Sequence, residues 1–350
     1  MANTTIPWDD GSGDNLYFSA DAFEGNQEVL VSSDANAGSE RSKTVTFSAQ
    51  GAEPKSLGII QLGSGTPTRE FDDWVKDGDT HLWIEIVNDY QKAQEIRIRM
   101  IGTIDWGDGT AAESVSVTTN TSFTHTYANT GRYRIDLHPT SGTFYIGGGS
   151  TAWCIMGERN NNKTYKQSVL YQVEVGSSII NTITTAAFQC CRGLRRVFIP
   201  KTIISLYQQL FNDCTALTQV IFEDVTKITD TLTSTSFFYN CQALQDISGF
   251  SVKYASNTIN QTIRNCYSLA EFIIPAAVTN ISAASFTNTY GLKHLWVYPQ
   301  TPPTVASANA FNGLNTGCVI HVPNGKLSAY QSANIWSTYA SQMVEMPASS

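Results

Sequence analysis

The chain has 350 residues, a length that suggests two or three domains rather than one core. Hydrophobic residues make up 41% of it, which fits a globular chain and excludes a disordered one. The net charge of -8, without a long basic run, argues against nucleic acid and anionic membranes as partners, because binding phosphate needs clustered cations. No run of eighteen apolar residues is present, so no bilayer-spanning segment is expected.

Short strands separated by turn residues are expected over residues 1–63. Apolar and polar residues alternate in four places, around Leu16 and Phe18, Val29 and Val31, Val45 and Phe47, and Leu57 and Ile59. This spacing predicts a small β-sandwich. The first ten residues lack the basic and apolar regions of a secretory signal, which favours either a chain that is not exported by that route or a signal that has been removed.

The phrase VSSDANAGSERSKTVTFSAQG, followed by LGIIQLG, resembles a BACON domain. Such domains are immunoglobulin-like modules of gut Bacteroidetes proteins and of virion proteins of their phages. The resemblance covers roughly residues 10–63 and implies either carbohydrate binding or a spacer role.

A second strand-rich block follows a Gly, Ser, Thr and Pro linker at residues 62–69. It contains the phrases DWGDGT, from Asp105, and HTYANTGRY, from His125. The pair resembles a polycystic-kidney-disease (PKD) domain, which implies a second immunoglobulin-like sandwich over residues 64–147. Asp105 and Asp108 are the weak candidates for a Ca²⁺ site, although calcium prefers six or more oxygens and the local sequence offers few others. In the family these residues mostly brace the turn.

Residues 148–176 are first glycine-rich and then asparagine-rich, which predicts a hinge and the entry to a solenoid. Trp153 and Cys154 lie in this segment and are expected to shield the first repeat. Its GGGS run is too weak a signal for a phosphate-binding loop.

One phrase then recurs at solenoid-like spacing: an aromatic or aliphatic residue, a cysteine, a leucine and another apolar residue at three-residue steps. Its cysteines, at 191, 214, 241 and 266, are 23, 27 and 25 residues apart by subtraction, and Thr289 takes the fifth position. Stacked in a solenoid, these thiols are expected to be reduced interior filler rather than bridges or metal ligands. Reduced cysteines suit a protein that folds in a cytoplasm.

The copies FNDCTALTQVIF and IRNCYSLAEFIIP, with the closing HVPNGKLSAYQSANIWSTYA, resemble the Bacteroidetes surface-antigen class of leucine-rich repeats, family five. The resemblance implies a leucine-rich-repeat solenoid with a C-terminal cap over residues 177–350. The expected fold class is therefore mainly β, with two N-terminal immunoglobulin-like β-sandwiches followed by this solenoid.

Strand alternation predicts which repeat residues face outward. If Val197 and Ile199 point inward, the positions between them point outward, and most are large and apolar. The predicted partner or glycan interface consists of Phe198, Ile221, Ile273, Trp296 and Tyr298, with Glu174, Ser248 and Phe250 also expected outward. An exposed apolar stripe marks an interaction surface, so the alternatives are a cover from this chain, a protein partner or symmetry mate in a homo-oligomer, or stacking on sugar rings.

No enzyme is expected. The five histidines show no metal-ligand spacing, no G-x-S-x-G nucleophile motif is present, and no cofactor is implied. The sequence favours an adhesion or structural protein of a gut Bacteroidetes phage virion, a fibre or decoration protein that binds host or mucosal glycans or proteins. The alternative is an extracellular or surface-anchored bacterial adhesin.

Overall fold

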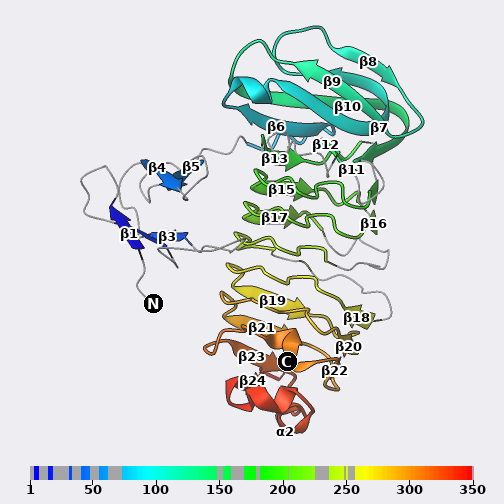
Figure 1. Cartoon of the computed structure of the whole chain (residues 1–350). Helices are drawn as coiled ribbons and strands as arrows, with labels where there is room; N and C mark the ends of the chain where they lie inside the picture. Colours follow the sequence, from blue (N-terminus) through cyan, green and yellow to red (C-terminus); the bar gives the residue numbers. More distant parts are fainter. Residues whose placement is uncertain are drawn as a thin grey trace. The chain divides into compact units, whose positions relative to one another are not determined.

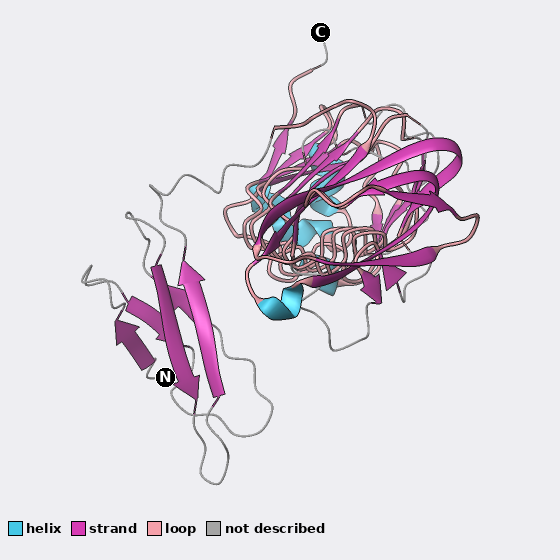
Figure 2. Cartoon of the chain, turned by 90° about the horizontal axis from the view of Figure 1, so that it is seen from above, coloured by secondary structure: helices cyan, strands magenta, loops and turns pink. Residues whose placement is uncertain are grey.

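The computed structural model describes residues 4–7, 15–18, 31–33, 41–47, 55–61, 73–147, 153–158, 169–178, 182–203, 205–224, 236–247, 250 and 257–348. These residues are mainly β, with helix confined to short segments (Figure 2). The chain divides into two compact units, residues 1–73 and residues 74–350.

The first unit contains five described strands. β1 (Thr4–Pro7), β2 (Asn15–Phe18) and β3 (Val31–Ser33) form an antiparallel sheet, and β4 (Arg41–Phe47) pairs with β5 (Lys55–Gln61). The strands predicted around Leu16, Val31, Val45 and Leu57 are therefore present. The BACON-like sandwich itself stays a prediction, because these strands form two separate small sheets in the described residues.

The second unit begins with five strands that lead into the repeats (Figure 1). They are β6 (Thr80–Ile86), β7 (Ala93–Asp105), β8 (Glu113–Ser116), β9 (Thr121–Thr126) and β10 (Gly131–Ile146), with a short helix η1 (Asp89–Gln91) after β6. The two phrases that suggested a PKD domain pack together: His125 stacks on Trp106 at 4.9 Å between ring centroids, and the Tyr127 hydroxyl donates to the Trp106 carbonyl. The PKD assignment stays a prediction.

The segment 148–176, predicted as a hinge and solenoid cap, includes a truncated copy of the repeat phrase at Leu170 and Val173, and this copy forms a central strand of the fold. β13 (Leu170–Glu174) pairs antiparallel with β6 on one side and parallel with β15 (Arg196–Ile199) on the other. One eight-stranded sheet therefore runs through the predicted boundary, in the order β17-β15-β13-β6-β10-β7-β8, with β9 also on β7. The sequence predicted a domain boundary between β6 and β13, whereas both strands belong to one sheet. Their pairing is a contact between distant segments, which no local sequence pattern encodes.

The repeats supply two columns of parallel strands. The first column continues with β17 (Gln219–Phe222) and resumes in a second sheet of β19 (Glu271–Ile274), β21 (His294–Val297), β23 (Val319–Val322) and β24 (Met343–Glu345). The other column consists of two-residue strands: β14 (Thr182–Ile183), β16 (Ser205–Leu206), β18 (Thr258–Ile259), β20 (Asn280–Ile281) and β22 (Thr304–Val305). A β11–β12 hairpin (Trp153–Cys154 and Gly157–Glu158) precedes them.

The repeated phrase forms the core, as predicted. Phe188, Phe211 and Phe238 stack almost parallel, with successive centroids 5.6 and 5.5 Å apart. The thiols of Cys214, Cys241 and Cys266 each donate to the carbonyl of the aromatic residue one repeat earlier, at 3.0 to 3.1 Å. All seven cysteines are free and buried, and burial raises the pKa of the ladder thiols, so they act as small apolar residues.

The residue before the ladder position, which holds a cysteine, Thr289 or Leu314, has a left-handed backbone. Asp213, Asn240, Asn265 and Asn288 all have φ near 60°, and Gly313, before Leu314, has φ 79°. Asp, Asn and Gly tolerate this conformation best. Side chains in the row also bond one another, as in the 2.7 Å hydrogen bond from the Asn240 amide to Asp213. The first repeat departs from the pattern, because Cys190 occupies the position with φ 60°.

Replacing Cys190 with asparagine is expected to raise the free energy of unfolding by about 0.5–1 kcal/mol, because asparagine reduces the strain of the left-handed backbone. Chemical denaturation measures the change. The neighbouring substitution Cys191→Asn is the matched control: Cys191 is fully buried, so an amide there should destabilise the chain. A Cys190→Asn variant less stable than the wild type contradicts the prediction.

The C-terminal end of the solenoid is closed by η4 (Ala308–Phe311), α2 (Leu327–Ser332) and η5 (Trp336–Gln342). Trp336 and Tyr330 are fully buried, and both anchor to proline carbonyls: the indole N–H donates to Pro303 at 2.8 Å and the phenol to Pro299 at 2.7 Å. The predicted cap is therefore present.

Candidate functional site on the outward sheet face

The outward face of the strand column has two lanes of side chains, because residues on one face of a sheet repeat every second position. We call the first the apolar lane: Glu174, Phe198, Ile221, Ile273, Trp296, His321 and Val344 in register order. We call the second the polar lane: Gln172, Arg196, Gln219, Asp246, Glu271, His294 and Val319. Burial alternates as predicted along β17, β19, β21 and β23, whereas β13 is buried throughout and β15 is buried from Val197 on.

Phe198 belongs to the apolar lane but is covered by the chain itself. Its side chain is only 6% exposed, because the Trp74 ring lies on it at 5.6 Å between centroids and the Lys76 ammonium lies 4.9 Å from its centroid. We call residues 74–78 the strap. Phe198 therefore does not present a free surface, which is the outcome that a cover from this chain predicts.

The strap is held by Glu174. This carboxylate is 2% exposed and accepts the backbone N–H groups of Val75 at 2.7 Å and Lys76 at 2.6 Å. Gly176 lies where the strap ends, and its missing side chain is required there, because a Cβ would come within 2.4 Å of the Gly78 carbonyl. Glu174 was expected to face solvent and instead serves as the anchor of the strap.

The other predicted interface residues differ in exposure. Ile221, Ile273 and Trp296 are half-buried on the open lane, and Tyr298 is 44% exposed one position beyond it. Phe250 is wrongly predicted, since it is 3% exposed and packs on Phe222, Phe237 and Phe238. Ser248 lies outside the described residues.

Trp296 and His321 form a face-to-face aromatic stack in the open part of the apolar lane, which we call the platform. Their rings stack with centroids 3.7 Å apart and planes 10° from parallel. His294, in the polar lane, has its Nδ1 3.0 Å from the His321 Nε2, so one of these two nitrogens must accept from the other. Burial and the neighbouring His294 lower the pKa of His321, against the opposing effect of Glu271, so His321 is neutral at neutral pH.

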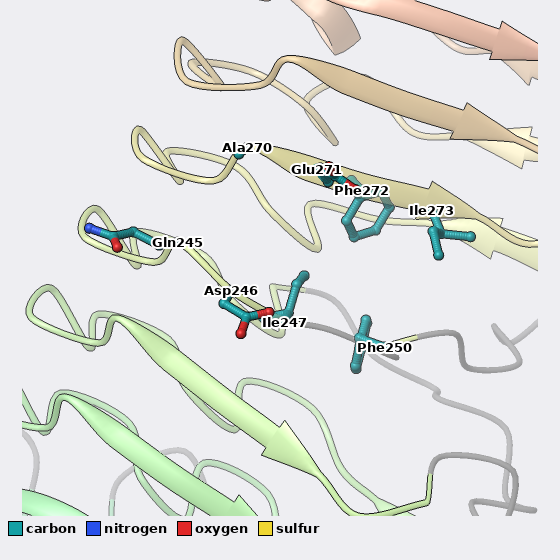
Figure 3. A pocket seen from close by; sticks show the side chains of 8 residues that line it. All are labelled: Gln245, Asp246, Ile247, Phe250, Ala270, Glu271, Phe272 and Ile273. Carbon is teal, nitrogen blue, oxygen red and sulfur yellow. The ribbon is translucent and has the colours of Figure 1, made fainter. Parts of the chain in front are cut away.

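A cavity of about 430 Å³ adjoins the platform (Figure 3). It lies between Gln245–Ile247 of one repeat and β19 of the next. Asp246 makes an isolated bridge to Gln219 of β17, whereas β19 belongs to the second sheet. Asp246 and Glu271 contribute carboxylates to its lining, Gln245 an amide, and Ile273, Phe272 and Phe250 an apolar floor. Glu271 and Ile273, which line the cavity, pair in register with His294 and Trp296, so the cavity lies one strand away from the platform.

The carboxylates proposed for calcium are occupied by bonds within the chain. Asp105 accepts the Gly107 N–H at 2.8 Å, while Asp108 accepts both the N–H and the hydroxyl of Thr110 and lies 2.8 Å from His125. Partial burial opposes ionisation, but the hydrogen bonds from Thr110 and His125 lower the pKa of Asp108 to about 2. These contacts favour the turn-bracing role over a metal site. Within the described residues, no group of three His, Cys, Asp or Glu side chains is placed to hold a metal ion.

A charged cluster at the base of the strap was not anticipated from the sequence. His81 is 1% exposed and lies between Asp136, at 2.6 Å, and Asp77, at 2.9 Å. Burial opposes its protonation, but these two carboxylates outweigh that effect and raise its pKa. Arg134 completes the cluster with two bonds to Asp136. These contacts bond β6 and β10 to the strap.

Sequence reasoning missed Asp246, Glu271, His294 and His321 as members of the face. A usable signal was present, since His321 occupies the same repeat position as Trp296, one strand further on. Metal-ligand spacing alone does not show that His294 and His321 lie on the outward face of the strands.

Comparison with known proteins supports the repeat assignment. Residues 160–293 match the family model described as BspA type leucine rich repeat region, in six copies. A crystal structure of a leucine-rich repeat protein from Bacteroides ovatus ATCC 8483 is similar at 19% identity and a TM-score of 0.35, covering 51% of this chain. The chain spans 42% of that protein. No curated protein matches the sequence. In the part of the chain that the structure describes, no helix has the length and apolar character needed to cross a membrane.

Proposed function

We propose that this chain is a non-enzymatic adhesion protein that binds carbohydrate through the platform of Trp296 and His321. The observation that supports this most directly is the stack itself: two parallel rings, 3.7 Å apart, on an open sheet face. A ring pair with a purely structural role can be fully buried, whereas a ring pair that binds a ligand must lie on an exposed face, as Trp296 and His321 do.

The surroundings of the platform have the chemistry that a sugar requires. A sugar ring has an apolar face of C–H groups, which packs on aromatic rings, and an edge of hydroxyls, which bond to carboxylates, amides and imidazoles. The apolar lane supplies the first kind of contact through Trp296 and Ile273, with Tyr298 beside it. The polar lane supplies the second through Glu271 and His294.

Each such contact is weak, so useful adhesion needs many copies. Linking several sites raises the effective concentration for the second and later contacts, and avidity then exceeds the affinity of one site. We therefore propose a homo-oligomer or a multicopy display, with the solenoid sheet face directed at the target.

Two places of display fit this role, a virion of a gut Bacteroidetes phage and a bacterial surface. The seven free, buried cysteines favour the virion, because phage proteins fold in the reducing cytoplasm of their host. The family match of residues 160–293 fits either place. Mass spectrometry of purified phage virions distinguishes display on a virion from display on a bacterial surface. Peptides of this chain in the particles support the virion, and their absence supports the bacterial surface.

Binding of the purified full chain to a glycan array, displayed on multivalent beads, tests the function. Wild-type protein should bind a subset of glycans, and Trp296→Ala should lose that binding while keeping the wild-type circular dichroism spectrum. The matched control is Tyr90→Ala, since Tyr90 is an exposed aromatic residue on η1, away from the repeats. Absence of binding to any glycan, or equal binding by Trp296→Ala, rejects the carbohydrate function.

A further inference from the structure

From β17 onward, the described positions of the two lanes include carboxylates but no Lys or Arg side chain. From β17 onward, the described positions of the polar lane are Gln219, Asp246, Glu271, His294 and Val319, and those of the apolar lane are Ile221, Ile273, Trp296, His321 and Val344. Arg196 belongs to the polar lane further back, on β15, but its guanidinium lies over the Trp74 ring at 4.8 Å. Lys293 precedes β21 and belongs to neither lane.

Glu271 is the acidic group closest to the platform. It is exposed, it lies beside His294 in the sheet register, and it also lines the cavity with Asp246. Asp246 accepts a 2.9 Å hydrogen bond from the Gln219 amide, which fixes the orientation of its carboxylate. A ligand that lies on Trp296 and extends into the cavity therefore passes two carboxylates.

We propose, building on the carbohydrate function above, that this site selects neutral glycans and rejects those that carry sialic acid, uronic acid or sulfate groups. Hydroxyl and acetamido groups of a neutral sugar donate hydrogen bonds to Glu271. A carboxylate or sulfate at the same place cannot donate and is repelled by Glu271.

The His321 ring does not offset this repulsion at neutral pH. Protein sites that bind sialylated or sulfated ligands supply Arg or Lys to pair with the anion. The His321 ring of the platform is neutral here, since its pKa is lowered by burial and by His294. Each carboxylate about 4–6 Å from an anionic group disfavours binding severalfold in a surface environment, and the effect falls as salt rises.

The test compares matched pairs of glycans on the full chain. The probes are N-acetyllactosamine and its sialylated form, coupled at equal density to the same beads. We expect the neutral glycan to bind at least about fivefold more tightly at low ionic strength, the ratio to shrink at high salt, and Glu271→Gln to reduce the ratio. Tyr90→Ala should keep the wild-type ratio.

The outcomes separate this inference from the function on which it rests. Equal or tighter binding of the sialylated form, or a ratio that Glu271→Gln leaves unchanged, overturns the selectivity while leaving carbohydrate binding in place. Binding that is lost with Trp296→Ala shows that the measured ratio belongs to this site. Binding that survives Trp296→Ala places the ligand elsewhere and overturns both.

Discussion

Replacing Phe211 with alanine is expected to lower the free energy of unfolding by about 3–5 kcal/mol, the usual cost of removing a buried aromatic side chain. Phe211 is 0% exposed and lies between Phe188 and Phe238, with both neighbouring rings within 10° of parallel. Truncation removes two stacking contacts and leaves a cavity in the middle of the column, which no adjacent side chain is free to fill.

The position in a solenoid adds a second effect. Each repeat contacts only its neighbours, so a weak interface separates the column into two parts that unfold at different denaturant concentrations. The transition of Phe211→Ala should therefore be broader, with a lower m-value, as well as shifted. Urea denaturation followed by circular dichroism measures both quantities.

The control for this experiment is Tyr90→Ala, at a side chain that is 82% exposed, for which a change within about 0.5 kcal/mol is expected. A loss of less than 1 kcal/mol for Phe211→Ala contradicts the ring column as the core. A shifted but equally steep transition contradicts only the nearest-neighbour part of the argument.

The inner residues of the repeats were predictable because the sequence repeats them. The repeated phrase recurs at similar spacing, and in the copy made of Phe211, Cys214, Leu217 and Val220 all four residues are buried, as the repeat pattern predicts. The left-handed row of Asp213, Asn240 and Asn265 was not predicted, although Asn or Asp before a cysteine of the repeat is a turn signal in the same copies.

The strap was not predictable from the same sequence. Its position depends on Glu174 meeting the backbone of Val75 and Lys76, residues almost one hundred positions earlier. No periodicity links such distant segments, and the linker-like composition before residue 73 indicated a domain boundary instead. Strand alternation therefore predicted correctly that the Phe198 side chain points out of the solenoid, but it predicted its solvent exposure wrongly. The side-chain direction depends on the local strand, whereas the covering Trp74 comes from a distant segment.

This difference also explains why the platform lies at the far end of the lane. Near β15 the apolar lane is occupied by Trp74 of the same chain, and further along it is open at Trp296. The same repeat position thus has two roles: Phe198 is covered by Trp74 of the same chain, whereas Trp296, further along the solenoid, is open to solvent.

Replacing Glu174 with alanine is expected to destabilise attachment of the strap by about 3–6 kcal/mol, since hydrogen bonds to a charged group contribute about 1.5–3 kcal/mol each and this carboxylate accepts two. Hydrogen exchange at the amides of Val75 and Lys76 measures the loss directly. Glu174→Gln retains one acceptor oxygen and should have an intermediate effect.

Release of the strap should also expose a cleavage site, because Lys76 lies in it next to the Phe198 ring. Brief trypsin treatment of Glu174→Ala should cut after Lys76 and separate residues 1–76 from the repeats, while wild-type protein resists cutting there. If the exchange rates at Val75 and Lys76 stay at wild-type values, Glu174 is not the anchor, and stacking of Trp74 on Phe198 holds the strap without it. The double variant Glu174→Ala with Trp74→Ala separates these contributions, because the two groups bind different parts of the same segment and their coupling is measured by the cycle.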